Sequence, residues 1–133
     1  MNIERLTKLA ELLYWVAAEH KPFDLTVWIN DQDPYSETFD PQRKAGECGT
    51  AACAVGYAAC DPWFNAQGLS LVDGEPAIRD VEEGWDSVEI FFDLGEGDAR
   101  HLFCSSRYCA GPETGPSQVA TRIREFIASE TQA

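Results

Sequence analysis

The sequence predicts a mainly α-helical α+β fold, in which residues 1–133 form a single compact domain of about four helices with a small β-hairpin or short strands. Three observations lead to this prediction. The 133 residues suit one ordinary domain, and 44% of them are hydrophobic, which is enough for one core. Both ends of the chain carry the apolar spacing of amphipathic helices. In the middle, an Asp-Gly pair separates two short apolar stretches, as in a hairpin.

The two terminal helices are the clearest elements. The first covers roughly residues 2–19 and ends before Pro22. Its apolar stripe consists of Ile3, Leu6, Ala10, Leu13 and Ala17. In the second helix, Ser117 is the expected N-cap. Its apolar face consists of Val119, Ile123, Phe126 and Ile127.

The segments between these helices are shorter. Residues 23–30 alternate apolar and polar side chains, which fits a strand or an extended loop around Trp28. Residues 31–47 are rich in Asp, Pro and Gly and are expected to form an exposed loop. A short helix is expected after Thr50, with Thr50 as its cap and an end near residues 60–62. Asp73-Gly74 is the expected hairpin turn.

The segment from residue 87 to residue 103 allows two interpretations. Alternation of Val88, Ile90 and Phe92 predicts a strand that buries these three side chains and exposes Phe91 between them. The apolar residues after a Gly-containing turn instead have helical spacing. They are Leu94, Ala99, Leu102 and Phe103.

Sequence features also bear on location. No apolar run approaches the ~18 residues that span a bilayer, so we expect no membrane segment. The first fifteen residues place charges inside an apolar pattern, which indicates a helix rather than a secretion signal. We therefore expect a cytoplasmic protein whose five cysteines stay reduced.

Charge is the strongest bulk signal. The chain has 10 basic and 23 acidic residues, a net charge of −13. The stretch from Asp73 to Asp98 holds ten acids and one base, Arg79, and so carries −9 of that charge. The ten acids are Asp73, Glu75, Asp80, Glu82, Glu83, Asp86, Glu89, Asp93, Glu96 and Asp98. Such a field repels nucleic acid and anionic membranes and attracts basic proteins.

The acidic stretch has two interpretations. Charge runs often form only a solvated surface that keeps a protein soluble. Alternatively, the carboxylates form a partner-binding face that imitates the phosphate rows of a nucleic acid, with Trp85, Phe91 or Phe92 as an apolar anchor. The residues predicted for this face are Asp73, Glu75, Asp80, Glu82, Glu83, Trp85, Asp86, Glu89, Asp93, Glu96 and Asp98.

The stretch "ECGTAACAVGYAAC", residues 47–60, concentrates three cysteines among small residues. The favoured interpretation is a small-residue helix buried at the centre of the domain. A catalytic alternative makes Cys48 a nucleophile activated at a helix start, as in papain-like peptidases, with His101 as its base and Asp86 or Asp93 orienting that histidine.

Metal sites are a further alternative. Cys48, Cys53, Cys104 and Cys109 form two pairs with four-residue gaps, at the edge of the spacing that zinc sites use, and Cys60 and His101 lie nearby in sequence. Cys104 and Cys109 are also close enough to form a disulfide, although a reducing compartment disfavours one. The acidic, glycine-bearing stretches lack the twelve-residue calcium loop, so calcium is weakly indicated. No cofactor is expected.

The motif "CGTAACAVGYA" and the later "DLGEGDARHLF" resemble small bacterial and phage-type proteins with a Cys-Gly-Thr-x-x-Cys-x-x-Gly-x-Ala pattern. The terminal helices are similar too, whereas Tyr57 stands where the pattern has Trp. The resemblance implies a compact domain in a mobile-element context, and that family has no assigned chemistry to carry over.

The leading hypothesis is a small acidic phage or mobile-element protein that is not an enzyme. It would inhibit a basic host defence protein that handles nucleic acid, by protein–protein contact and possible nucleic-acid mimicry. The alternatives are a cysteine-dependent hydrolase or transferase using Cys48 and His101, and a small zinc-stabilised interaction domain.

Overall fold

The computed structural model describes residues 1–29, 51–72, 74–78 and 82–131. Within them it has six α-helices, three strands and two short 3-10 helices. The elements are α1 (Ile3–Ala18), α2 (Ala54–Ala59), α3 (Pro62–Ala66), β1 (Leu69–Val72), β2 (Glu75–Ile78), β3 (Glu82–Glu83), α4 (Gly84–Phe92), α5 (Glu96–Phe103), η1 (Ser105–Arg107), η2 (Gly111–Glu113) and α6 (Pro116–Thr131). The predicted mainly helical α+β fold is confirmed. The expected exposed loop, residues 31–47, lies outside the described residues.

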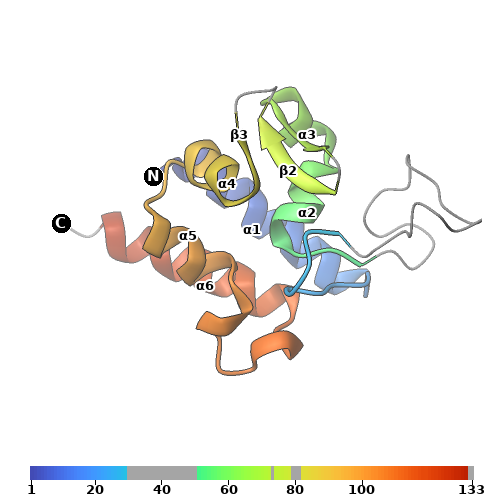
Figure 1. The fold of residues 1–133 in the computed structure, drawn as a ribbon. Coiled ribbons are helices and arrows are strands. Elements are labelled where there is room, and N and C mark those ends of the chain that lie inside the picture. Colours follow the sequence, from blue (N-terminus) through green and yellow to red (C-terminus); the bar gives the residue numbers. More distant parts are fainter. Residues whose placement is uncertain (30–50, 73, 79–81, 132–133) are drawn as a thin grey trace, which may run out of the picture.

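The two terminal helices form one layer of the molecule. α1 and α6 lie side by side and run antiparallel, so that the start of α1 is beside the end of α6 (Figure 1). Leu6, Leu9 and Leu13 of α1 and Val119 and Ile123 of α6 are completely buried. The apolar stripes predicted from sequence therefore point into the core over most of their length, because helical residues three and four apart share a face, whereas Ile3 at the start of α1 is 44% exposed.

The small-residue helix α2 lies at the centre, in contact with α1, α3 and the sheet. All six of its residues are buried, as the favoured interpretation of this stretch predicts. The expected cap was wrong: the N-cap is Cys53, whose sulfur accepts the N–H of Gly56, and not Thr50. Thr50 lies outside the described residues, and the helix starts four positions after it.

Gly56 explains why α2 must be thin. A Cβ at this position would lie 1.7 Å from the carbonyl oxygen of Trp28 and 2.8 Å from the Cβ of Ala52. The segment that contains Trp28 therefore crosses the helix in backbone contact, which only a glycine permits.

That crossing segment is not the regular strand predicted for residues 23–30. It makes only isolated bridges, from Phe23 and from Ile29 to Ala52, with turns between them. The alternative of an extended loop around Trp28 is the better description. The segment is tied down by hydrogen bonds to α2, including one from the Tyr57 hydroxyl to the Pro22 carbonyl and one from the Cys53 N–H to the Val27 carbonyl.

The hairpin was predicted correctly. β1 pairs antiparallel with β2, and Val72 lies opposite Glu75 across the two-residue turn. Gly74 has φ +79°, the left-handed conformation that such tight turns require. β3 adds a short third strand to the order β1-β2-β3. In Figure 1 the sheet lies with α3 at one end of the molecule.

Residues 84–92 form a helix, α4, so the prediction of a strand that buries Ile90 was wrong. Val88, Phe91 and Phe92 are buried, whereas Ile90 is 53% exposed. The helix ends in a Schellman motif, in which the Leu94 N–H reaches the Glu89 carbonyl and Asp93 takes a left-handed φ of +53°. The helical interpretation of the residues after Gly95 is confirmed by α5.

The start of α6 also differs from the prediction. The helix begins at Pro116, so Ser117 lies inside the first turn and is not the cap. Instead, the side chain of Gln118 accepts the N–H of Gly115 at 2.6 Å, which is one half of a capping box. Proline at the first helical position loses no hydrogen bond, because that N–H has no partner within the helix.

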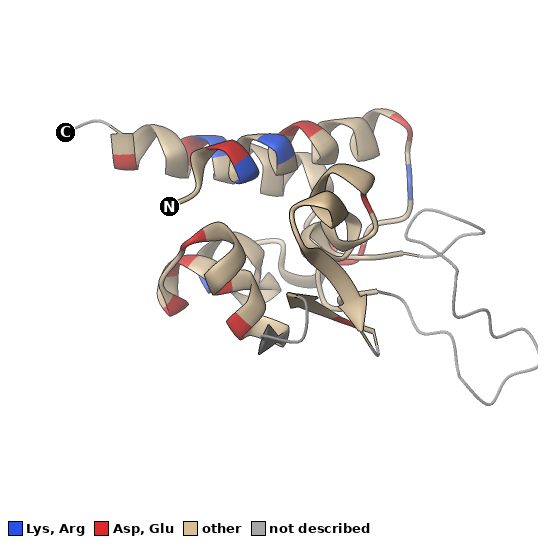
Figure 2. Cartoon of the chain, turned by 90° about the horizontal axis from the view of Figure 1, so that it is seen from above, with Lys and Arg blue, Asp and Glu red and all other residues tan. Residues whose placement is uncertain are grey.

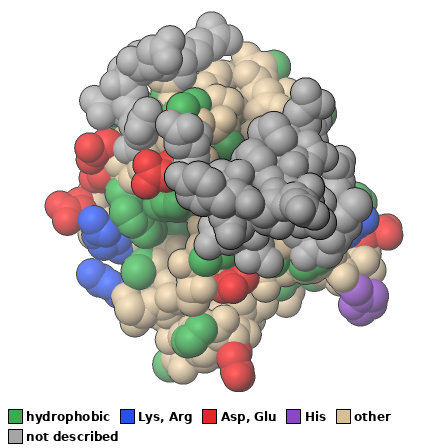
Figure 3. Space-filling model, turned by 45° about the vertical axis from the view of Figure 1, so that its right-hand side comes forward, with side chains coloured by type: hydrophobic (Ala, Val, Ile, Leu, Met, Phe, Trp, Pro, Cys, Tyr) green, Lys and Arg blue, Asp and Glu red, His purple; other side chains and the backbone are tan. Residues whose placement is uncertain are grey.

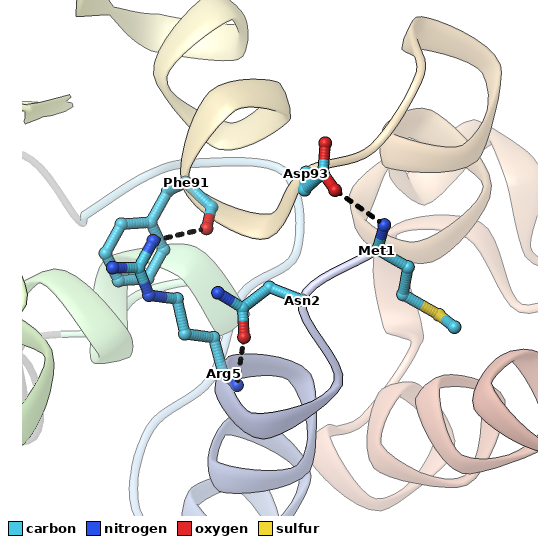
Figure 4. A network of polar contacts seen from close by, with 5 residues as sticks. All are labelled: Met1, Asn2, Arg5, Phe91 and Asp93. Carbon is cyan, nitrogen blue, oxygen red and sulfur yellow. Dashed lines mark hydrogen bonds and ion pairs between the residues drawn. The ribbon is translucent and has the colours of Figure 1, made fainter.

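A polar network fastens the start of α1 to the end of α4 (Figure 4). The Asn2 N–H donates to the Phe92 carbonyl at 2.8 Å, and Arg5 Nη1 donates to the Phe91 carbonyl at 2.8 Å. The Arg5 guanidinium also lies 4.1 Å from the centroid of the Phe91 ring. These contacts occupy carbonyls that a helix end leaves without partners, and they fix the position of α4.

Candidate functional site

The exposed side of α4 carries a stripe of carboxylates with an apolar residue among them. Asp86 and Glu89, three residues apart, lie on one face of the helix, and Asp93 follows directly after its last residue in a left-handed conformation. Ile90 belongs to the same face and, at 53%, is the most exposed large hydrophobic residue that the structure describes. The alternation in the sequence predicted that Ile90 is buried. The signal that could have shown otherwise is its helical spacing, because Ile90 is four residues after the exposed Asp86.

α5 extends this acidic surface. Its first turn exposes Glu96 and Asp98, and α4 and α5 are in contact. Red positions gather on these two helices in Figure 2, with a single blue position among them. We call Asp86, Glu89, Asp93, Glu96 and Asp98, together with Ile90, the α4–α5 acidic face.

Two of these carboxylates are partly neutralised. The N-terminal amine of Met1 lies 2.9 Å from Asp93, which remains 81% exposed, and Arg100 lies 3.7 Å from Glu96. The hydrogen bond and the positive charge of the amine hold the pKa of Asp93 below its ordinary value.

The other predicted partner-binding residues do not all join this face. Glu75 is exposed at the hairpin turn, on a different element. Asp73 and Asp80 lie outside the described residues. Glu82 and Glu83 form β3 directly before α4.

None of the three predicted aromatic anchors is available as an exposed anchor. Trp85 is half-buried and makes an edge contact with Trp28, with ring centroids 5.0 Å apart. Arg100 also covers the Trp85 ring, at 4.9 Å from its centroid. Phe91 and Phe92 are core residues. Ile90 is the apolar side chain that the acidic face presents.

The surface is not uniformly acidic. On the face seen in Figure 3, acidic and basic side chains are interspersed, with hydrophobic side chains between them.

The structure gives no support to the catalytic alternative. Cys48 lies outside the described residues, and α2 begins at Ala54, so Cys48 does not start that helix. His101 is exposed in the last turn of α5, where its backbone carbonyl accepts a hydrogen bond from Arg122. Of the residues proposed to orient this histidine, Asp93 instead pairs with the N-terminal amine.

The zinc alternative gains no support from the cysteines that the structure describes. Within the described ranges, no three His, Cys, Asp or Glu residues gather where they could hold a metal ion. Cys53 is fully buried, which raises the pKa of its thiol to about 11 and keeps it protonated. Cys109 is exposed, and Cys104 and Cys109 are both thiols rather than a disulfide.

A cavity of about 490 Å³ lies between the segment that crosses α2 and the end of α5. Its walls include Trp28, Trp85 and Phe103, and two cysteines, Cys53 and Cys104, line it. Sequence spacing placed Cys53 and Cys104 in different pairs of one possible zinc site, so this shared cavity was not predicted.

The chain matches no protein-family model, and comparisons with curated proteins and with solved structures give no match. Among the residues that the structure describes, no helix is both long and apolar enough to cross a bilayer.

Proposed function

We propose that the protein is a binding protein that uses the α4–α5 acidic face to cover a basic surface on a host protein that handles nucleic acid. The observation that supports this most is the stripe Asp86, Glu89 and Asp93 with the exposed Ile90 inside it. The mobile-element setting follows from the resemblance of the Cys-Gly-Thr motif, and the inhibition of a host defence protein follows from the concentrated acidic charge; both are part of the same proposal.

The spacing of the stripe fits a surface built for phosphates. At 1.5 Å of rise per residue, Asp86 and Glu89 are ~4.5 Å apart along the helix axis. One strand of duplex DNA carries a phosphate about every 3.4 Å along its axis. The stripe is therefore sparser than a nucleic-acid strand, and it imitates a few phosphates rather than a whole duplex.

Charge alone would give a weak complex. Exposed ion pairs contribute about 0–1 kcal/mol each and are screened by salt. Complexes are held mainly by a few buried side chains at the interface centre, with a polar rim around them. Ile90, flanked by Asp86, Glu89 and Asp93, matches that arrangement.

The first experiment is capture from a nuclease-treated bacterial lysate on the immobilised full chain. The variant Asp86→Asn/Glu89→Gln removes two charges from the face, whereas Glu125→Gln/Glu130→Gln removes two from the exposed side of α6. A specific partner is a protein that wild type and the α6 variant retain and the α4 variant does not.

Two further results decide the proposal. Duplex DNA should release the retained protein, because both ligands would occupy the same basic surface. Retention that is equal for both variants, or that DNA leaves unchanged, contradicts the proposed function.

A further inference from the structure

The cavity between the segment that crosses α2 and the end of α5 contains a second chemical feature, which does not depend on the proposed binding function. Cys104 lies in its wall at the end of α5, close to Trp85 and Phe103, and is partly exposed. The volume of the cavity, about 490 Å³, is within the range of small-molecule pockets, ~300–1,000 Å³.

The loop that carries Cys104 is held on both sides. Arg122 Nη1 donates to the carbonyls of His101 at 2.9 Å and Arg107 at 2.7 Å, and the Tyr108 hydroxyl donates to the Leu102 carbonyl at 2.6 Å. Cys104 is also the N-cap residue of η1. The sulfur is therefore presented to the cavity by a fixed backbone.

Groups around the sulfur favour its thiolate form. The Cys104 sulfur lies 3.2 Å from the Ser106 hydroxyl oxygen. Burial raises the pKa of the Cys104 thiol, but hydrogen bonds from Ser106 and the positive charges of Arg100 and Arg107 outweigh that effect and lower it. The end of α5 opposes a thiolate, so these groups supply the stabilisation.

The second cysteine of the cavity is chemically different. Cys53 is buried, and its sulfur lies 3.8 Å from the Trp28 carbonyl oxygen, to which the thiol donates. Since desolvation raises its pKa to about 11, Cys53 is not a nucleophile at neutral pH. One cavity thus holds one activated thiol and one inert thiol.

The arginines also indicate the ligand's charge. Neither arginine lines the cavity itself, but Arg100 lies over the Trp85 ring, Arg107 is the last residue of η1, and the positive charges of both act on the Cys104 sulfur. Tryptophan walls accept flat or apolar groups, and the guanidinium groups favour carboxylates.

We propose that Cys104 is a modification site that exchanges with small anionic disulfides seated in this cavity. The Cys104 thiolate attacks one sulfur of the disulfide, and a new S–S bond forms as the small molecule's own S–S bond breaks. The other half leaves as a thiolate, and the proton that Cys104 lost before the attack is in the solvent. Cys104 is oxidised to a mixed disulfide, and the leaving half is reduced.

The test compares two probes on the folded full-length chain at neutral pH. One is 5,5′-dithiobis(2-nitrobenzoate), an anionic aromatic disulfide, and the other is 2,2′-dithiodipyridine, which is neutral. Rates come from the released thiol, and peptide mass spectrometry assigns each adduct to its cysteine. We expect the first anionic adduct at Cys104, with the fast phase lost in Cys104→Ser and kept in Cys109→Ser.

A further variant tests whether positive charge near Cys104 favours anionic disulfides. Arg107 is exposed, and Arg107→Gln should slow the anionic probe by about two- to fivefold, as expected for the loss of one charge near a partly exposed thiolate. The reaction with the neutral probe should slow less, because Arg107 speeds that reaction only by stabilising the Cys104 thiolate and does not attract the probe. First labelling at Cys109, or equal slowing of both probes, would overturn the proposal.

Discussion

At the scale of single residues, Gly56 is the position where the sequence has least freedom. The Trp28 carbonyl oxygen occupies the place where a Cβ would be, at 1.7 Å, so any side chain must push two backbone segments apart. Because the crossing segment also binds Cys53 and Tyr57, this displacement would reach the core.

Gly56→Ala is therefore expected to destabilise the protein by about 3 kcal/mol, the upper end of the range for overpacked cores. Gly97→Ala is the matched control, because its added Cβ meets no atom within 4 Å. That change in the first turn of α5 should be neutral or stabilise by ~0.5 kcal/mol. Urea denaturation of the two variants measures both effects. A Gly56→Ala protein as stable as wild type would contradict the close crossing.

Asp93 gives a prediction about pH. Its folded pKa is lowered by the N-terminal amine, so the stability it contributes is present above its ordinary pKa of 3.8 and is lost as pH falls through the lower folded value. Asp93→Asn removes the charge and tolerates the left-handed backbone.

The variant should unfold at lower urea concentration than wild type at about pH 6, and the difference between the two midpoints should shrink as the pH falls further below 3.8. A midpoint difference that stays the same as the pH is lowered would mean that the ion pair of Asp93 does not stabilise the fold.

At the scale of elements, α4 shows where sequence patterns fail. Val88, Ile90 and Phe92 alternate like a strand, yet the same residues fit a helix that buries Val88, Phe91 and Phe92. Nine residues contain only two helical turns, too few for periodicity to decide. The network from Asn2 and Arg5 to the end of α4 is a long-range contact, which local sequence does not reveal.

The two patterns predict opposite effects of substitution. In the helix, Phe91→Ala removes a buried ring and should cost about 3–5 kcal/mol. Ile90→Ala removes an exposed side chain and should change stability by less than about 0.5 kcal/mol. A strand would reverse this order. Urea midpoints with unchanged m-values distinguish the two.

The elements with strong local signals were predicted well. α1 and α6 have four or more turns of regular apolar spacing, and the hairpin has an Asp-Gly turn. The caps were predicted poorly: Cys53 and Gln118 act where Thr50 and Ser117 were expected. The residue that caps a helix depends on tertiary contacts at the start of the helix. At α2 the relevant contact is the close crossing of the segment that contains Trp28.

At the scale of the whole molecule, the acidic stretch is divided among elements. Sequence counting indicated the charge excess but not its distribution, because the spatial relation of α4, α5 and the hairpin is a tertiary property. Trp85 was a candidate anchor by sequence, and packing against Trp28 removes it from the surface. Ile90 replaces it.

The binding model makes a prediction at this scale. Once a partner is captured and purified, Ile90→Ala should weaken its binding by about tenfold, ~1.4 kcal/mol, without changing the salt dependence. Titration calorimetry at two salt concentrations measures both quantities. Unchanged affinity would mean that Ile90 lies outside the interface.

The most direct test of the central claim is the salt dependence of that partner's affinity for wild type and for Asp86→Asn/Glu89→Gln. We predict that wild-type affinity falls steeply as salt rises, that the variant binds at least about tenfold more weakly at low salt, and that its salt dependence is shallower. The Glu125→Gln/Glu130→Gln control should follow wild type. Identical salt dependence in the wild type and both variants would contradict the claim that the α4–α5 acidic face binds the partner.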